Sequence, residues 1–267
     1  MPNLRERVRV RSVLTVLCIA LASALGAHGR ATAQGRDAAT TATPRAAAPI
    51  DLTGFWVSVI TQDWRWRMVT PARGDYESIP ITLEAKRAGD AWDPAKDEAA
   101  GEACKGYGAP AIMSVPARVH ITWQDDTTLK VEADAGTQTR VLRFSITPAS
   151  PSRERTWQGE SVAAWERAGG ARAGGAGEAA PQFGSLRVVT TNLRPGYLRK
   201  NGVPYSANAE LTEYWDLQKE GNGDQRLVVT TEVKDPLYLR EPWLTALHFK
   251  KEPDGAKWDP TPCSARW

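Results

Sequence analysis

A run of alternating aromatic and cationic side chains, Trp64-Arg65-Trp66-Arg67-Met68, is the part of the sequence best suited to binding chemistry. An indole stacks on a flat apolar molecule or a sugar ring, and a guanidinium holds a carboxylate or phosphate through two parallel hydrogen bonds. We therefore take Trp64, Trp66, Arg65 and Arg67 as candidate ligand-binding residues. The alternative is that the tryptophans pack in the core while the arginines pair with carboxylates or face solvent.

A second candidate, Tyr197, lies near Lys200 and Tyr205 around the turn Asn201-Gly202. A loop that carries tyrosines can cover the mouth of a cavity and gate it. A loop of this kind can also be a packed excursion on the surface. We include Tyr197 among the candidate ligand-binding residues and leave both interpretations open.

Carboxylates and histidines give weaker signals of catalysis. Glu213 and Asp216 come closest to a catalytic pair, but three residues along a strand place them on opposite faces. Glu213 is kept as a candidate binding residue. His120 and His248 lack the neighbouring ligands of a zinc site, and the sequence has no Gly-rich phosphate loop and no G-x-S-x-G elbow. We expect no metal and no cofactor, whereas a Ser-His-Asp triad assembled in space stays open.

The N-terminal residues predict export. Residues 1–12 carry four arginines, residues 13–27 are small and apolar, and Ala31-Thr32-Ala33 fits a cleavage site, which together make a signal peptide over residues 1–33. The apolar run is too short to span a membrane, and Cys18 within it is not preceded by a lipobox. The sequence therefore predicts a periplasmic or extracellular protein with no membrane span after cleavage.

Removal of the signal peptide changes both the charge and the cysteine count. The whole chain has a net charge of +3, but residues 1–33 hold five arginines and one glutamate, so the remainder has a net charge of −1. This balance does not favour nucleic acid as a partner. Cys104 and Cys263 remain, and in an oxidising compartment we expect one disulfide between them. A nucleophilic Cys104 is the alternative.

The order of the chain predicts one domain that is mainly β. Residues 34–49 are rich in Ala, Thr and Arg and predict a disordered tether, residues 50–267 a single domain, and residues 168–180 a flexible Gly/Ala-rich loop. Short alternating segments separated by turns indicate a sandwich or an up-and-down barrel. Because closure removes the free edges of a long sheet, we expect an antiparallel barrel of about 8–10 strands with one or two short helices. Such a barrel would enclose a cavity for a small molecule. Strands are expected over residues 55–60, 64–69, 118–123, 129–133, 137–145, 156–166, 186–193, 210–217, 226–233 and 244–251, and helices over residues 82–103.

Gly54-Phe55-Trp56 forms a G-x-W motif at the start of the first strand. In a secreted chain of antiparallel strands, this motif resembles the calycins, the family of lipocalin-like barrels, and implies that Trp56 packs at the closed end. A second resemblance, carried by Trp157-Gln158-Gly159, residues 186–191, 211–213 and 227–236, and Pro242-Trp243, is to a group of secreted bacterial proteins of unknown activity. This second resemblance implies architecture and secretion only.

Three functions follow from these observations. The first is a barrel that binds a small, partly hydrophobic ligand, as the eleven tryptophans favour. The second is a hydrolase or isomerase that acts on a small hydrophobic or sugar-like substrate within the barrel. The third is a structural envelope protein with a solid core and no ligand. An enzyme requires a base, a residue that orients it and a charge-stabilising group to converge within hydrogen-bonding distance.

Overall fold

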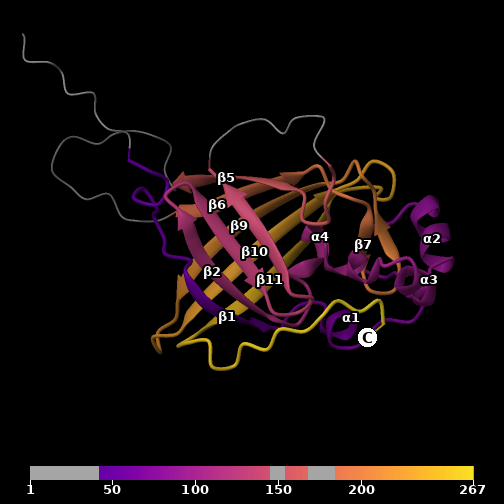
Figure 1. Cartoon of the computed structure of the whole chain (residues 1–267), viewed down its shortest axis with the longest axis horizontal. Coiled ribbons are helices and arrows are strands. Elements are labelled where there is room, and N and C mark those ends of the chain that lie inside the picture. The colour runs from indigo at the N-terminus through magenta and orange to yellow at the C-terminus, as the bar shows by residue number, and fades with distance from the viewer. Residues whose placement is uncertain (1–41, 145–153, 168–183, 267) are drawn as a thin grey trace, which may run out of the picture. The chain divides into compact units, whose positions relative to one another are not determined.

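In the computed structural model, nine strands close into a barrel, so that every strand has two hydrogen-bonded neighbours (Figure 1). Their order around the ring is β1-β11-β10-β9-β6-β5-β4-β3-β2. Closure removes the free edges that an open sheet would expose. The predicted all-β barrel of about 8–10 strands is confirmed. The strands are β1 Gly54–Val59, β2 Arg118–Asp125, β3 Thr128–Ala133, β4 Gln138–Arg143, β5 Glu160–Arg167, β6 Gly184–Thr191, β9 Glu210–Lys219, β10 Gln225–Lys234 and β11 Trp243–Glu252.

The structure describes residues 42–144, 154–167 and 184–266. The predicted signal peptide, the first part of the predicted tether and the Gly/Ala-rich loop lie outside these residues. Residues 42–49, which composition assigns to the tether, contact the barrel: Pro44 O accepts a hydrogen bond from Trp165 Nε1 at 2.7 Å, and Arg45 N donates to Asp126 O at 3.0 Å. The ordered part of the chain therefore begins before Ile50.

One pair of strands in the ring is parallel. Strand directions can alternate all the way around a ring only when the number of strands is even, so a ring of nine must contain a parallel pair. Here it is β4 and β5, which are joined over two register pairs, Leu142 with Ser161 and Arg143 with Val162. A parallel pair requires a long crossover connection, and the sequence leaves room for one, since β4 ends at Arg143 and β5 begins only at Glu160.

The two ends of the barrel differ in their connections. Short turns join β2 to β3 and β9 to β10 at one end, which we call the turn end. The helices of the described residues and the β7–β8 hairpin cover the other end, the helical end (Figure 1). There are more helical segments than the one or two expected, although none among the described residues has the length and apolar character needed to cross a membrane. The additional elements are α1 Trp64–Met68, α2 Leu83–Asp90, α3 Pro94–Ala99, the 3-10 helix η1 Ala103–Tyr107, α4 Ala109–Ile112, β7 Gly196–Arg199 and β8 Val203–Tyr205.

The strand predicted over residues 64–69 is wrong, because Trp64–Met68 forms the helix α1. Asp63 adopts a left-handed conformation with φ 53°, which ends the extended run that follows β1. Its carbonyl then accepts hydrogen bonds from the backbone N–H of Trp66 and Arg67. Alternation over five residues fits a strand and a single helical turn equally well. The predicted helical region is confirmed at α2 and α3, where Thr82 and Asp93 accept capping hydrogen bonds.

The loop predicted around Asn201-Gly202 is a two-stranded hairpin, β7–β8, rather than a gating loop. Asn201 is fully buried and donates to the carbonyls of Ala72 and Asp75. Gly202 has φ 86°, and a Cβ atom there would lie 2.3 Å from Trp92 Cβ, so the turn requires glycine. These contacts hold the hairpin firmly against the helical end.

The interior of the barrel is filled by side chains. Trp56, the tryptophan of the G-x-W motif, is completely buried, and its Nε1 donates to Leu52 O at 2.9 Å, so its structural role is confirmed. All four residues of α4 are buried at the helical end. The interior side chains include Val119, Ile121, Leu129, Val131, Leu142, Ala163, Leu186, Val188, Trp215, Leu227, Val229, Leu247 and Phe249.

A salt bridge crosses this apolar interior. Arg140 on β4 donates to both carboxylate oxygens of Glu213 on β9, at 3.0 and 2.6 Å, and the two side chains are 2% and 0% exposed. Thr190 and Ser161 extend the polar network through a hydroxyl–hydroxyl contact of 2.7 Å. Glu213, a candidate for ligand binding, thus lies in the core with its charge already balanced.

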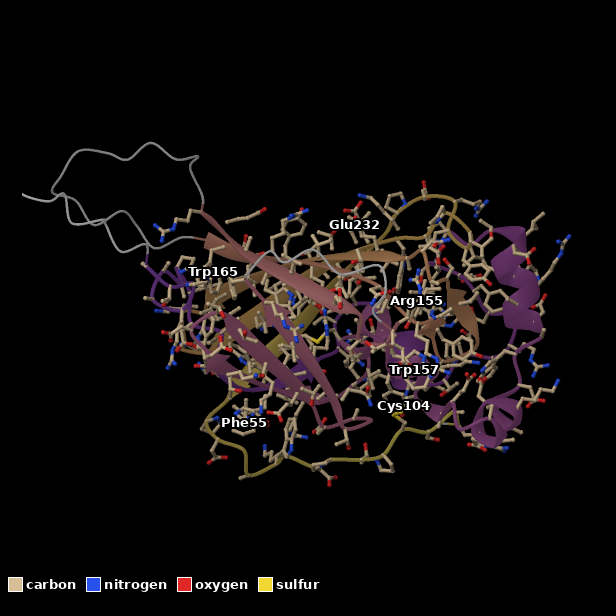
Figure 2. All side chains as sticks on the ribbon, turned by 45° about the horizontal axis from the view of Figure 1, so that its top comes forward. Phe55, Cys104, Arg155, Trp157, Trp165 and Glu232 are labelled. Carbon is tan, nitrogen blue, oxygen red and sulfur yellow. A yellow bond between two sulfur atoms is a disulfide. The ribbon has the colours of Figure 1, made fainter. Side chains whose placement is uncertain are left out.

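The C-terminal segment returns from β11 to the helical end along the outside of β1 and β2 (Figure 1). On the way, Trp258 covers Phe55 and His120, whose rings are stacked with centroids 4.0 Å apart. The segment ends at the predicted Cys104–Cys263 disulfide, which is confirmed, with a Cα–Cα distance of 5.1 Å. In Figure 2, Cys104 lies at the helical end and Trp165 at the turn end.

Removal of one partner of the buried salt bridge should destabilise the barrel strongly. Glu213→Gln leaves the Arg140 charge in the core without its counter-charge, and we expect a loss of about 3–5 kcal/mol in the free energy of unfolding, measured by urea denaturation. The double variant Arg140→Met with Glu213→Leu removes both charges and should recover most of that loss. A Glu213→Gln variant as stable as the wild type would contradict this role.

Removal of the disulfide should also lower stability. The bond links residues 159 positions apart. Because it lowers the conformational entropy of the unfolded chain, it stabilises the folded protein by roughly 4–5 kcal/mol. We expect the variant with Cys104→Ser and Cys263→Ser to unfold at a lower temperature in calorimetry. Reductant should lower the melting temperature of the wild type and leave that of the variant unchanged. Equal melting temperatures for the two proteins in oxidising buffer would refute the prediction.

Candidate functional site

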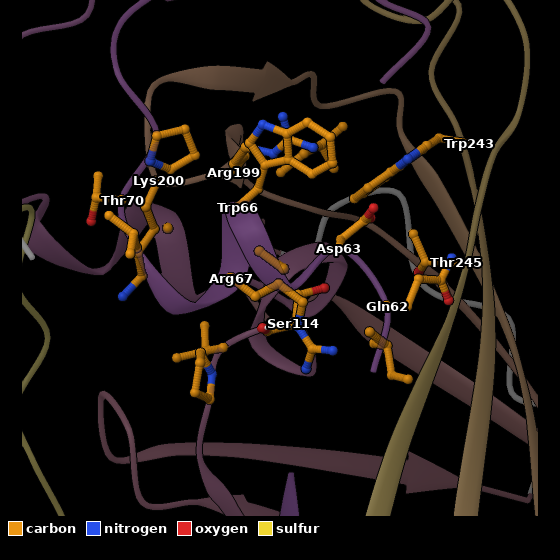
Figure 3. Close-up of a pocket in the computed structure, with 18 residues that line it drawn as sticks. Gln62, Asp63, Trp66, Arg67, Thr70, Ser114, Arg199, Lys200, Trp243 and Thr245 are labelled. Carbon is orange, nitrogen blue, oxygen red and sulfur yellow. Dashed lines mark hydrogen bonds between the residues drawn. The ribbon is translucent and has the colours of Figure 1, made fainter. Parts of the chain in front are cut away.

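A cavity of about 50 Å³ lies at the helical end, between α1, α4, the β7–β8 hairpin and the first residues of β11 (Figure 3). It reaches the surface beside Val69, which is 67% exposed. Its walls are aromatic and aliphatic, with a few polar groups set among them. The lining residues include Trp66, Val69, Pro71, Ala111, Val115, Pro116, Leu198, Trp243 and Leu247 among the apolar ones, and Gln62, Asp63, Arg67, Thr70, Ser114, Arg199, Lys200 and Thr245 among the polar ones.

Arg67 is the polar group with the least satisfied hydrogen bonding. Its Nε donates to Ser114 O at 2.8 Å, whereas Nη1 and Nη2 are buried and have no hydrogen-bond partner among the described residues. Burial lowers the pKa of Arg67 to about 10, and the nearby Asp63 carboxylate acts in the opposite direction. The guanidinium therefore stays charged at neutral pH with two donors unused.

Arg199 and Trp66 form another part of the cavity wall, and there, in contrast to Arg67, the polar groups already have partners. The Arg199 guanidinium lies over the Trp66 ring, 4.9 Å from its centroid, and donates to Glu77 O and to Ser78 Oγ. Trp66 Nε1 donates to Asp75 Oδ1 at 3.1 Å. Stacking and hydrogen bonds thus fix α1 against the hairpin.

Lys200 lies at another part of the wall. Burial lowers the pKa of its ammonium to about 6. Its Nζ lies 3.9 Å from the centroid of the Tyr107 ring. The amine is therefore mostly neutral at pH 7 and adds little positive charge to the cavity.

Trp243 and Thr245 bring the barrel itself into the site. Both are in β11, and they lie on the opposite side of the cavity from Lys200 in Figure 3. Trp243 Nε1 donates a hydrogen bond to Ser78 O at 3.1 Å. The hydroxyls of Thr245 and Thr231 are hydrogen-bonded to each other at 2.6 Å. These groups are fixed by the fold and present mainly apolar surface to the cavity.

The structure brings two of the six predicted binding residues to this cavity, Trp66 and Arg67. Trp64 is 65% exposed on the outer side of α1, and Arg65 forms ion pairs with Asp75 and Glu77 at the surface. Neither of them lines the cavity.

The other two predicted residues lie elsewhere. The Tyr197 hydroxyl donates to Asp97 Oδ2 at 2.8 Å, beside a separate hollow of about 10 Å³. Burial and this carboxylate raise the pKa of Tyr197. Glu213 is in the barrel core. Sequence reasoning missed Arg199, Lys200 and Trp243 as lining residues, and the only available signal was the position of Lys200 beside the Asn201-Gly202 turn.

A larger hollow of about 1180 Å³ lies at the turn end, where the described chain stops at Arg167 and resumes at Gly184. Its walls combine charged groups such as Asp51, Lys219 and Lys251, with residues from both faces of β9 and β10. This hollow is wider than the cavity beside α1 and its lining is more polar, whereas small-molecule sites are lined mainly by apolar side chains.

Arg67, His120, Glu213 and His248, which the sequence offers as groups for catalysis, do not all converge at one place in the described part of the chain. Arg67 lies at the cavity, and His120 is stacked on Phe55 outside the barrel. Glu213 is held by Arg140 in the core, and His248 lies on the outer face of β11, where burial and two arginines lower its pKa. Nor do three or more His, Cys, Asp or Glu side chains gather as metal ligands would within the residues described.

Comparisons of the chain with protein-family models, curated protein sequences and solved structures give no match. The geometry of the cavity beside α1 is therefore the basis on which a function is proposed.

Replacement of Lys200 should change how stability depends on pH. Between about pH 6 and the ordinary lysine pKa of 10.5, the unfolded chain binds a proton at Lys200 and the folded chain does not, so stability rises with pH across this window. We expect Lys200→Met to flatten the rise in unfolding free energy between about pH 6.5 and 9, measured by urea titrations. Lys86→Met, at an exposed lysine, is the control and should leave the rise unchanged. An unchanged rise in Lys200→Met would rule out the effect.

Proposed function

We propose that this chain is a secreted or periplasmic binding protein whose barrel takes up a small, partly hydrophobic ligand at its helical end. The observation that carries the proposal is the cavity beside α1, in which aromatic and aliphatic walls surround a few polar groups. Small-molecule sites in proteins have this composition. The disulfide and the predicted signal peptide support a location outside the cytoplasm.

The size of the cavity limits how the ligand is held. A water molecule requires roughly 10–15 Å³ of such volume, so the cavity of about 50 Å³ accommodates only a few groups of that size. One end of the ligand is enclosed, and the remainder lies against the exposed rim at Val69. In lipocalins the barrel interior holds the ligand, whereas the interior here is filled, so the resemblance to calycins extends to the barrel and not to the position of the site.

The other two functions have less support. Catalysis by a hydrolase or isomerase requires convergent acid–base groups. Arg67 lies near enough to His248 to lower its pKa, but His120 is stacked on Phe55 and Glu213 is held by Arg140 in the core, so neither joins them. A purely structural protein does not need a cavity that contains a buried, unpaired guanidinium. Binding is therefore the function that the geometry supports best.

Filling the cavity should abolish binding. Ala111 is buried in α4 and lines the cavity, so Ala111→Leu occupies part of its volume. We expect small organic fragments that bind the wild type in ligand-observed NMR to lose their signal with this variant. Ala163→Leu is the matched control, because it overpacks the barrel interior to a similar degree without lining the cavity. Fragments that bind both variants equally, or no binding fragment at all, would overturn the proposed function.

A further inference from the structure

Arg67, which lines the cavity beside α1, has two guanidinium nitrogens whose hydrogen bonds are unused. Arg67 Nη1 and Nη2 are buried and have no acceptor among the described residues, and Arg67 forms no ion pair there. A buried charged donor without an acceptor is costly, and native proteins rarely retain one without a use. The two nitrogens of one guanidinium match the two oxygens of a planar anion. The missing acceptor is therefore best supplied from outside the chain.

Of the two arginines that line the cavity, Arg67 has guanidinium nitrogens without acceptors and Arg199 does not. Both arginines line the cavity and both are carried by elements at the helical end. Arg199 donates to Glu77 O and Ser78 Oγ and stacks on Trp66, so its guanidinium is already committed. Of the two guanidinium groups, only that of Arg67 therefore has both outer nitrogens without an acceptor among the described residues.

The charges around the cavity leave room for one negative charge. Burial lowers the pKa of Arg67 and of Arg199 to about 10, so both are positive at neutral pH, and the Asp63 carboxylate, which also lines the cavity, opposes the shift in both. The amine of Lys200 is mostly neutral at pH 7 because burial lowers its pKa to about 6. The local sum is one positive charge, which a monoanion neutralises.

The remaining walls distinguish between kinds of anion. A phosphate brings three or more oxygens and up to two charges, and each buried oxygen needs a donor. Beside Arg67 the wall continues from Ser114 into Val115 and Pro116, whose side chains are apolar, and Arg199 and Thr245 already have partners. The donors left for further anion oxygens are the neutral groups of Gln62, Thr70 and Ser114. A carboxylate has two oxygens and one charge, and a single guanidinium satisfies both.

We infer that the ligand of the cavity carries a carboxylate, which Arg67 Nη1 and Nη2 hold side by side, and that its apolar part lies against Trp66 and Trp243. This inference rests on the proposed binding function and adds the chemical class of the ligand. Arg67 lines the cavity, but Nη1 and Nη2 are buried in the structure, so binding requires a rotation about the outer torsions of the side chain that turns the two nitrogens towards the ligand.

The test compares matched pairs of probes that differ in charge. Acetate and acetamide have nearly the same shape, as do butyrate and butyramide. Binding of each is measured by ligand-observed NMR at constant ionic strength, with wild type, Arg67→Met and Arg65→Met. Arg65 is the matched control, because it precedes Trp66 on the same helix, lies at the surface and does not line the cavity. Inorganic phosphate is included as the competing anion.

We expect the wild type and Arg65→Met to bind the carboxylates at least about tenfold more tightly than the amides, since hydrogen bonds to charged groups are the strong ones. Arg67→Met should remove this preference, and Arg67→Lys should restore only part of it because a lysine lacks the two guanidinium donors. The Met variant should melt no lower than the wild type, since it removes a buried charge that lacks a partner.

Two outcomes separate failure of the inference from failure of the proposed function. If carboxylates and amides bind equally and Arg67→Met changes neither, or if phosphate binds in preference, the cavity is a binding site but the carboxylate assignment is wrong. If no probe binds and Ala111→Leu has no effect on any fragment, the binding function itself is wrong, and this inference falls with it.

Discussion

The filled interior of the barrel is the constraint on which the rest of the structure depends. Trp56 and Trp215 are completely buried within it, and the Arg140–Glu213 salt bridge crosses it. Because side chains in a protein core pack as densely as organic crystals, the axis has no space for a molecule. The proposed binding site therefore lies not on the axis but at the helical end, where residues 60–117 form no strand and build a different kind of surface. The barrel serves as the rigid support of that surface.

Much of the barrel could be predicted from the sequence, because its strands are long enough for their pattern to be unambiguous. The alternation through residues 118–133 continues across a turn and places apolar groups on one face throughout, as β2 and β3 do. Trp64–Met68 is too short for such a test. Its conformation depends on the left-handed backbone of Asp63 and on contacts of Trp66 with Asp75 and Arg199. These two contacts form only in the folded protein, so the local sequence does not show them.

Less of the site could be predicted, because four separate segments of the chain form it. The chemistry of its side chain identified Arg67 as a candidate, although the sequence placed it on a strand and the structure places it on the helix α1. Lys200 and Trp243 come from other segments, and no spacing in the sequence connects them with α1. Glu213 has the residue type of a functional group, but its burial against Arg140 depends on a pairing 73 residues away. The disulfide was simpler, since only Cys104 and Cys263 remained to pair.

The parallel contact between β4 and β5 has a consequence for the order of assembly. The ring consists of two meanders, β2-β3-β4 and β5-β6-β9-β10-β11, within which each strand pairs with the next strand of the barrel along the chain. Pairs that are close along the chain form with the smallest loss of loop entropy. The meanders can therefore form as two separate sheets, and β1 joins them by pairing with β2 of one and β11 of the other. By the same argument the cylinder closes last where β1 pairs with β11, since Phe55 and its partner Glu252 are far apart along the chain, whereas the β4–β5 contact joins near segments through only two register pairs.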